Sequence, residues 1–362
     1  MSMAVLLGLS VALGGCSGAP SGSGTETTTA AESADSAAAF AEESSAEESS
    51  AEEEASNAQA ESEGGEAQAR IGSLKGPTSM GLVKLMQDNE NGETEVSYDF
   101  TMAGKADELV GKIASGDLDL VLVPANVASV LYNKTEGQVK VIDLNTLGVL
   151  YVVASDESIQ SMEDLKGKTV YMTGKGTTPE YVMNYLLDES GLTGEVTLEF
   201  KSEATEVASV LKENTEAIGV LPQPFATAAC IQNTELKQVL DLTAVWDQFN
   251  ETSGSRMVTG VTIVRTGFLE EHSDVVEQFL EDHKESTAFT KEHPDEAAEL
   301  VAAQGIVEKA PIAARALPQC NIVCVTGDEM KAALEGYLTV LEGQDPQSVG
   351  GQLPGEDFYY LP

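Results

Sequence analysis

Two short turns carry the residues best suited to holding a small polar molecule. One is "LKGPTS" (74–79) and the other is "TGKGTTP" (173–179). Each places glycine, which permits a tight turn, and hydroxyl side chains directly before a helical pattern. Hydroxyls and free N–H groups at the start of a helix suit polar or anionic groups. The chemistry that these residues offer is therefore non-covalent capture.

Two further turns are placed in the same way. "VPANVA" (123–128) and "LPQPFA" (221–226) each follow a buried strand pattern and set proline where a helix opens. Thr and Ser at a helix start are also ordinary N-caps, and glycines can serve the turn alone. Four turns with matched placement favour the binding role over that structural one.

Residues for covalent or metal chemistry are scarce. Lys175 is followed by Gly176 rather than Ser or Thr, which excludes a Walker motif. The only histidines are His272, His283 and His293, all in one late helical region, and no nucleophile–base pair is visible. We therefore expect no catalysis and no cofactor. We also expect no metal site, because neither Cys230 nor any histidine is recognisably spaced with Cys320 and Cys324. Those last two cysteines could form a disulfide or remain two buried thiols.

Composition bounds the class of partner. The 362 residues are 42% hydrophobic, which allows a sizeable core, and the formal net charge is −40. A nucleic-acid partner is excluded because phosphate binding needs a basic surface.

The N-terminus indicates export. "MAVLLGLSVAL" (3–13) has the length of a signal-peptide apolar region and is too short to span a bilayer. It runs into "LGGC" (13–16), which resembles the bacterial lipobox, so we expect a signal peptide over 1–15 and a lipid on Cys16. The alternative is a plain secretory signal with a chance cysteine. No Lys or Arg precedes the apolar run, so the true start can lie upstream.

The next segment is built to stay unfolded. Residues 17–69 carry 13 acids and no Lys or Arg, and consist mainly of Ser, Ala, Glu, Gly and Thr. Such a segment buries too little apolar surface to offset the entropy of ordering. We expect a lipidated, disordered, acidic tether over 16–69.

The rest of the chain alternates strand and helix patterns. Strand patterns lie at 93–100, 118–123, 168–172, 195–200, 217–221 and 257–264, with helical periods between them. This alternation predicts an α/β fold with largely parallel sheets. "SGDLDLVLVPANVASVL" (115–131) has a counterpart in "ENTEAIGVLPQPFATAA" (213–229), which indicates two similar lobes. In open α/β sheets ligands bind beyond the carboxyl ends of the strands, so the four turns would meet across one cleft.

The chain resembles the solute-binding proteins of ABC transporters with the type II periplasmic-binding fold. The likeness rests on "GDLDLVLVPANVAS", "SMEDLKGKTVYMTGKGTTPEYVMNYLL", "GVLPQPFATAA" and residues 266–301. It is strongest to the branch for nitrate, sulfonates, taurine and thiamine-precursor pyrimidines. The resemblance implies an α/β, two-lobed fold with a hinge and an interlobe cleft: lobe 1 over 70–154 plus 256–362, and lobe 2 over 155–255. "LYVVAS" (150–155) and "SRMVTG" (255–260) would be the hinge crossings.

The resemblance also implies a site and partners. The expected ligand-binding residues are Thr78, Ser79, Met80, Pro124, Ala125, Asn126, Thr173, Gly174, Thr177, Thr178, Gln223 and Phe225, with Trp246 and Arg256 added for aromatic or anion contacts. The expected function is an extracytoplasmic receptor that delivers a small polar organic solute, sulfonate or pyrimidine-like, to an ABC permease and ATPase. We expect a monomer, lipid-anchored to the membrane of a Gram-positive cell. A sensor of the same fold without transport, or an extracytoplasmic enzyme using the cleft, are the alternatives.

Overall fold

The computed structural model describes residues 68–362. The expected signal peptide, Cys16 and all but the last two residues of the tether lie outside the described residues. Within the described part, no helix combines the length and the apolar character needed to span a bilayer.

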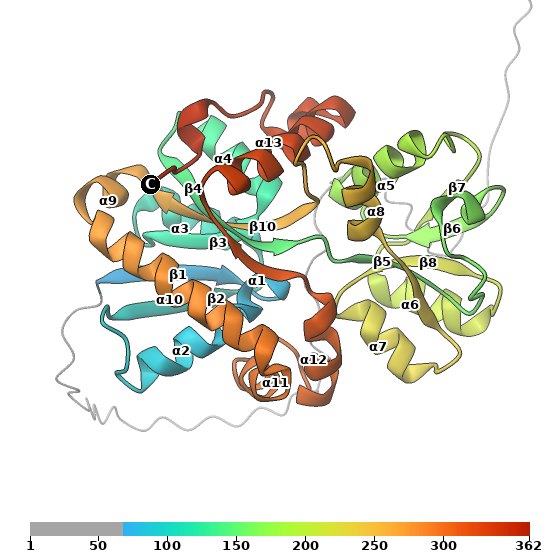
Figure 1. Ribbon diagram of the computed structural model, residues 1–362, viewed down its shortest axis with the longest axis horizontal. Coiled ribbons are helices and arrows are strands. Elements are labelled where there is room, and N and C mark those ends of the chain that lie inside the picture. The colour runs from blue at the N-terminus through green and yellow to red at the C-terminus, as the bar shows by residue number, and fades with distance from the viewer. Residues whose placement is uncertain (1–67) are drawn as a thin grey trace, which may run out of the picture. The chain divides into compact units, whose positions relative to one another are not determined.

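The described chain alternates helices and strands along most of its length (Figure 1). The strands are β1 (Ala69–Leu74), β2 (Tyr98–Ala103), β3 (Leu120–Pro124), β4 (Val139–Leu147), β5 (Leu150–Ala154), β6 (Thr169–Met172), β7 (Thr197–Phe200), β8 (Ile218–Pro222), β9 (Lys237–Asp241), β10 (Val258–Arg265) and β11 (Ile322–Val325). The α-helices are α1 (Pro77–Met80), α2 (Val83–Glu90), α3 (Ala106–Ser115), α4 (Ala125–Lys134), α5 (Thr178–Glu189), α6 (Ala204–Glu213), α7 (Phe225–Gln232), α8 (Leu242–Phe249), α9 (Thr266–Glu271), α10 (Ser273–Glu292), α11 (Pro294–Ala303), α12 (Ala310–Ala316) and α13 (Gly327–Gln344). Short 3₁₀ turns are η1 (Met162–Leu165), η2 (Leu317–Gln319), η3 (Pro346–Val349) and η4 (Glu356–Phe358).

The strands form two sheets with related orders. The first sheet runs β2-β1-β3-β10-β4-β11 and the second runs β7-β6-β8-β5-β9. In each, the first three strands are parallel and the fourth is antiparallel to both of its neighbours. The antiparallel fourth strand is in each case the one that follows a crossing from the other sheet. The repeated turns predicted from the sequence therefore belong to a repeated topology.

Strand residues alternate between the two faces of the first sheet. Leu120 and Leu122 pack with α2 and α10, whereas Val121 and Val123 pack with α3, α4 and α13. This alternation follows from the two-residue period of a strand. Because helices cover both faces, β3 is apolar at every one of these four positions, as expected for a doubly covered sheet.

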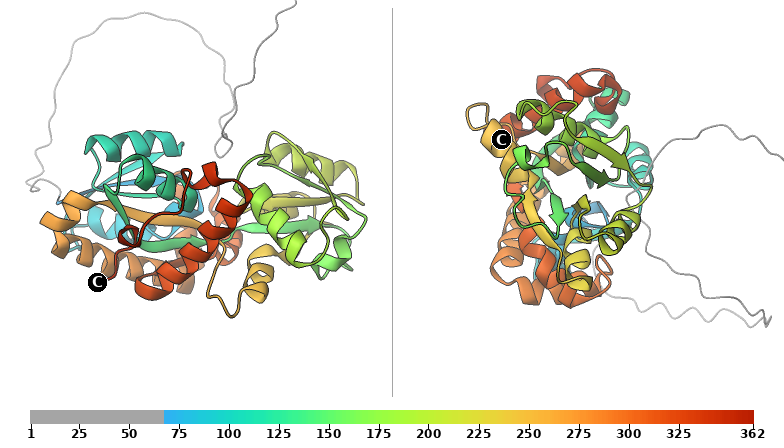
Figure 2. Two further views of the ribbon diagram at one scale, coloured as in Figure 1. Left: turned by 90° about the horizontal axis from the view of Figure 1, so that it is seen from above. Right: turned by 90° about the vertical axis from the view of Figure 1, so that its right-hand side faces the viewer.

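The second sheet is covered in the same manner. Helices α6 and α7 pack on one face, and α5 and α8 pack on the other. Helix α13 reaches from the first sheet to α5 on the second (Figure 2). There the Tyr337 ring on α13 meets Trp246 of α8 edge-on, with ring centroids 5.5 Å apart.

The α/β fold class is confirmed, and the strand predictions hold with shifts. The predicted strand at 93–100 begins only at Tyr98, and β1, β4, β5, β9 and β11 have no counterpart among the six predicted strand ranges. The segment 150–155, assigned above to the first lobe and its hinge, forms β5, which pairs with β8 and β9 of the second sheet. The chain thus passes between the sheets at Gly148 and Val149, five residues earlier than expected.

Candidate ligand-binding site

The first turn is held to its strand by its own hydroxyls. Thr78 Oγ1 donates to the Leu74 carbonyl at 2.8 Å, and Ser79 Oγ lies 2.6 Å from Ser73 Oγ. Thr78 and Ser79 are buried. Met80, also expected at the site, is fully buried in an apolar cluster that includes residues of α11 and α12. In this structure these side chains build the turn or pack in the core, and those of Ser79 and Met80, which have no exposed surface, cannot touch a ligand in this state.

The turn that follows β3 (123–128), here the second turn, lies next to the first turn (74–79). Strands β1 and β3 are parallel neighbours, so the turns that follow them share one edge of the sheet. Pro124 ends β3 and pairs with Gly260 on β10. A Cβ added at Gly260 would lie 2.4 Å from Thr78 Cγ2 and 2.4 Å from Asn145 Oδ1. Thr78 of the first turn and Pro124 after β3 therefore both lie beside Gly260.

Helix α4 begins at the second turn. Ala125 is buried and Asn126 is partly exposed in its first turn. Asn145, which belongs to no motif in the sequence, also lies beside Gly260, where the two turns meet. Its amide donates to Thr262 Oγ1 at 3.3 Å and accepts from Thr146 Oγ1 at 2.9 Å.

The glycine-rich turn of the second sheet is tightly tied. Gly174 and Gly176 have φ of 83° and 71°, a region that favours glycine. Thr177 Oγ1 donates to the Gly174 carbonyl at 2.7 Å, and the Gly176 N–H donates to Glu180. Tyr181 donates to the Gly176 carbonyl at 2.8 Å. The turn is therefore held on both sides of Gly176.

Tyr181 also connects this turn to the chain beyond α13. Its hydroxyl lies 3.1 Å from Asp345 Oδ2. Burial and the hydrogen bond to this carboxylate raise the pKa of Tyr181. Thr173 and Thr178 on the same turn are partly exposed, and Thr177 is exposed.

The fourth turn follows β8, the parallel neighbour of β6. Gln223 is 3% exposed; its amide donates to Gln238 Oε1 at 2.9 Å and accepts from Thr227 Oγ1 at 2.8 Å. Phe225 opens α7 and is partly exposed. Because β6 and β8 are parallel and adjacent, the two second-sheet turns also lie at one edge.

Trp246 and Arg256 are placed differently from the turns. Trp246 has no exposed surface, and its indole N–H donates to Ser255 Oγ at 3.3 Å. Its ring lies 4.5 Å from that of Tyr185, so its surroundings are those of a core residue. We therefore remove Trp246 from the candidate site, because a side chain without exposed surface cannot touch a ligand in this state.

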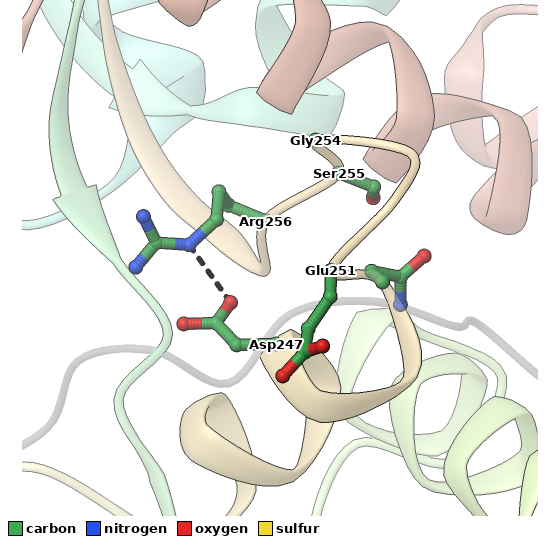
Figure 3. A pocket seen from close by; sticks show the side chains of 6 residues that line it. Asp247, Glu251, Gly254, Ser255 and Arg256 are labelled. Atoms are coloured by element: carbon green, nitrogen blue, oxygen red, sulfur yellow. Dashed lines mark hydrogen bonds and ion pairs between the residues drawn. The ribbon is translucent and has the colours of Figure 1, made fainter.

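Arg256 lines a small acidic pocket (Figure 3). Its Nε donates to Asp247 Oδ1 at 2.8 Å, and its two terminal nitrogens point away from Glu251. The pocket, about 270 Å³, is lined by Asp247, Asn250, Glu251, Gly254, Ser255 and Arg256. The carboxylates of Asp247 and Glu251 outnumber the single guanidinium, so this pocket is poorly suited to an anion. In this structure Arg256 forms an ion pair with Asp247.

The described cysteines are all free. Cys320 is buried, while Cys230 and Cys324 are partly exposed. Cys320 and Cys324, for which either a disulfide or two thiols was expected, are therefore both thiols in this structure.

Comparison with known proteins identifies the fold. A family model described as "NMT1/THI5 like" matches residues 137–297. No curated protein sequence matches the chain. A structure described as an ABC transporter from Parabacteroides distasonis has a TM-score of 0.68 at 21% identity, covering 81% of this chain and 98% of that one. The periplasmic aliphatic sulphonate binding protein SsuA from Escherichia coli has a TM-score of 0.63 at 16% identity, covering 81% and 92%.

A further similar structure was solved with a ligand. The alkanesulfonate-binding protein SsuA from Xanthomonas axonopodis pv. citri, bound to MOPS, has a TM-score of 0.58 at 13% identity and covers 82% of this chain and 99% of that one. These likenesses confirm, for the fold, the resemblance to periplasmic solute-binding proteins of ABC transporters. Two of these three structures, both SsuA proteins, are described as sulfonate-binding proteins.

Proposed function

We propose that this protein is the extracytoplasmic solute receptor of an ABC importer, which captures a small polar organic solute, sulfonate or pyrimidine-like, between its two sheets. The observation that carries the proposal is the placement of four turns in two adjacent pairs, each at the carboxyl edge of its sheet. Such edges are where open α/β sheets bind ligands. The similarity in fold to sulfonate-binding proteins supports the same conclusion.

The groups near the turns favour neutral donors over a buried cation. Asn126 and Thr178 are partly exposed and can contribute an amide and a hydroxyl. Helices α4, α5 and α7 begin at three of the turns, and their first N–H groups suit the oxygens of a sulfonate. Arg256 is already paired with Asp247, and Lys175 is exposed. A flat pyrimidine would instead use the ring of Phe225.

We further propose that the two sheets belong to two lobes that close on the solute. The chain crosses between them near Gly148 and again before β10, and two crossing segments allow a hinge motion. Permease and ATPase subunits would then recognise the closed form.

The membrane anchor is a separate proposal that rests on the lipobox-like "LGGC" alone. Replacing Cys16 by Ala would release the protein from membranes into the soluble fraction. Membrane retention of Cys16→Ala at the wild-type level would contradict a lipid on this residue.

A thermal-shift panel tests the binding function. The probes are methanesulfonate, taurine and MOPS, one aminopyrimidine and a set of amino acids. A solute at 100 times its Kd stabilises the folded state by about 2.7 kcal/mol, which raises the melting temperature by several degrees. No shift with any probe, in protein that melts cooperatively, would count against the proposal.

A matched pair of variants tests the location of the site. Thr177→Val with Thr178→Val should weaken binding of the strongest probe by about tenfold, as expected for lost polar contacts of roughly 1.4 kcal/mol. Thr197→Val is the control, because Thr197 is an exposed threonine at the opposite end of the neighbouring strand β7. Equal affinity in both variants would move the site away from the glycine-rich turn.

A further inference from the structure

A second group of reactive side chains lies inside the first sheet, on three segments far apart in sequence. Asp143 is on β4, His283 on α10 and Cys324 on β11. One ligand atom from each lies within 4.8 Å of the other two. Asp143 and His283 have no exposed surface, whereas Cys324 is partly exposed.

The pairing of β11 with β4 is what brings the thiol to the carboxylate. The two strands are antiparallel neighbours with Val325 opposite Leu144, so Cys324 and Asp143, each adjacent to one member of this pair, lie diagonally across the two strands. Helix α10 then lays His283 across them, with Nδ1 3.2 Å from Asp143 Oδ2. The spacing of 41 residues between His283 and Cys324 follows no metal motif, which is why sequence reasoning rejected a metal here.

The distances suit a tetrahedral ion. Zinc binds nitrogen and carboxylate oxygen near 2.0 Å and thiolate sulfur near 2.3 Å, so its ligand atoms sit about 3.3–3.8 Å apart. The Asp143–His283 separation of 3.2 Å already matches that spacing, and the other pairs, at no more than 4.8 Å, need a contraction of at most about 1.5 Å. A thiolate beside an imidazole selects thiophilic cations such as Zn²⁺ over Ca²⁺ or Mg²⁺.

The surroundings also fit a metal's outer shell. Thr262 Oγ1 donates to the other oxygen of Asp143 at 2.9 Å, which fixes the carboxylate. His283 Nε2 and Thr287 Oγ1 are buried atoms without a hydrogen-bond partner. They lie one turn apart on α10, and a Cβ at Gly81 would be 3.4 Å and 3.0 Å from them.

Those two orphan atoms can satisfy each other. Buried polar atoms without partners are rare. A histidine that binds metal through one nitrogen usually donates its other N–H to an oxygen. If Nδ1 held an ion, a small rotation would direct the Nε2–H of His283 to the Thr287 hydroxyl.

We propose that Asp143, His283 and Cys324 bind one thiophilic divalent cation, with Zn²⁺ the best match, entering past the partly exposed Cys324. The fourth position would be left to water. The bound ion would join β4, β11 and α10 and so stabilise the first sheet. The site is independent of the solute site proposed above, because none of its three ligands belongs to the four turns.

Cobalt titration of the chelator-treated full-length chain tests the site. Co²⁺ bound to thiolate gives a near-ultraviolet charge-transfer band, and we expect one equivalent to produce it and Zn²⁺ to abolish it by displacement. Cys324→Ser should remove the band and weaken Zn²⁺ binding by more than the 10- to 100-fold typical of losing an outer-shell partner. Cys230→Ser is the matched control, because its partly exposed thiol lies in the second sheet's helix α7.

Three outcomes would overturn the proposal. The first is folded wild-type protein that takes up neither ion at one equivalent. The second is a charge-transfer band that survives in Cys324→Ser. The third is a band lost equally in Cys230→Ser. A second variant, Thr287→Val, leaves the three ligands in place and should lower Zn²⁺ affinity by about tenfold; an unchanged affinity there would refute the role given to Thr287 within the site.

Discussion

Adding one methyl group at Gly148 should destabilise the protein at the crossing between its sheets. A Cβ built there lies 1.9 Å from Met257 Cε and 2.3 Å from Thr243 Oγ1, distances that atoms in contact do not adopt. The Gly148 carbonyl also accepts from Asn321 at 2.7 Å. Gly148 and Met257 are on the two segments that connect the sheets, so the substitution tests how tightly those segments pack.

The expected cost follows from what can move. Met257 is 2% exposed but flexible, and it can yield part of the space. Thr243 is 4% exposed and β-branched, so its rotamers are few. Overpacking of a closed core costs about 1–3 kcal/mol, and we place Gly148→Ala in the middle of that range.

Equilibrium unfolding in urea measures this cost as a lower midpoint with an unchanged slope. Gly111→Ala is the control: Gly111 is exposed within α3, and a Cβ there meets nothing within 4 Å. That variant should gain about 0.5–1 kcal/mol through helix propensity. Wild-type stability in Gly148→Ala would refute the reasoning.

A double-mutant cycle assigns the clash. Shortening Met257 to Ala leaves a cavity and costs about 2–5 kcal/mol alone. In the background of Gly148→Ala the same change also relieves the 1.9 Å contact. The two losses should therefore sum to more than the loss in the double variant, by at least about 0.5 kcal/mol. Strict additivity would show that Thr243, not Met257, carries the strain.

Three further predictions concern other parts of the chain. Asp119 is 4% exposed in its side chain and is held by Arg70 and Arg265; burial alone would raise its pKa, but the two arginines outweigh burial and lower it. The stabilisation of the folded state by ionised Asp119 is thus complete above the unfolded pKa near 3.9 and is lost as pH falls through the folded pKa. Urea unfolding should therefore show that Asp119→Asn costs about 2–3 kcal/mol of stability at pH 7 and progressively less below about pH 4. A cost that stays constant down to pH 2 would contradict this. Tyr181→Phe should lower the stability by about 1 kcal/mol and weaken solute binding, because it removes the hydrogen bond to the Gly176 carbonyl. An unchanged solute affinity in calorimetry would show that the glycine-rich turn is not part of the binding site. Trp246, the only tryptophan, should emit in the blue and resist acrylamide quenching until the protein unfolds, and ready quenching in the folded state would show that it is exposed.

The strands that could be predicted are those whose burial shows in the sequence. Strands β3 and β8 are nearly continuous apolar runs, because helices cover both faces of each sheet. Strand β4 was missed although almost all of it is buried. Its second half reads "DLNT", and these polar residues break the pattern. They are buried because partners such as Thr262 and His283, more than a hundred residues away, satisfy them.

The residues of the candidate site likewise fall into those that the sequence could predict and those that it could not. The four turns were predictable because proline, glycine and threonine act locally, through backbone geometry that a few neighbouring residues decide. Asn145 and Gln238 were not predictable, since each acquires its role from a strand pairing. Trp246 was misplaced for a related reason: an indole carries both an apolar body and a donor, and only the fold decides whether that donor meets a ligand or, as here, Ser255.

The proposed metal group extends this argument to chemistry. Known zinc motifs are recognisable because their ligands lie on one short segment, so that spacing stands in for geometry. In this chain the ligands come from a middle strand of the first sheet, from its edge strand and from a covering helix, and the edge strand β11 is supplied by the last fifth of the sequence. Among residues 68–362, the first half of the sequence supplies only Asp143 to this group, and the second half supplies His283 and Cys324. Only the return of the chain to the first sheet creates it, which is why a site of this kind escapes any reading of residue spacing.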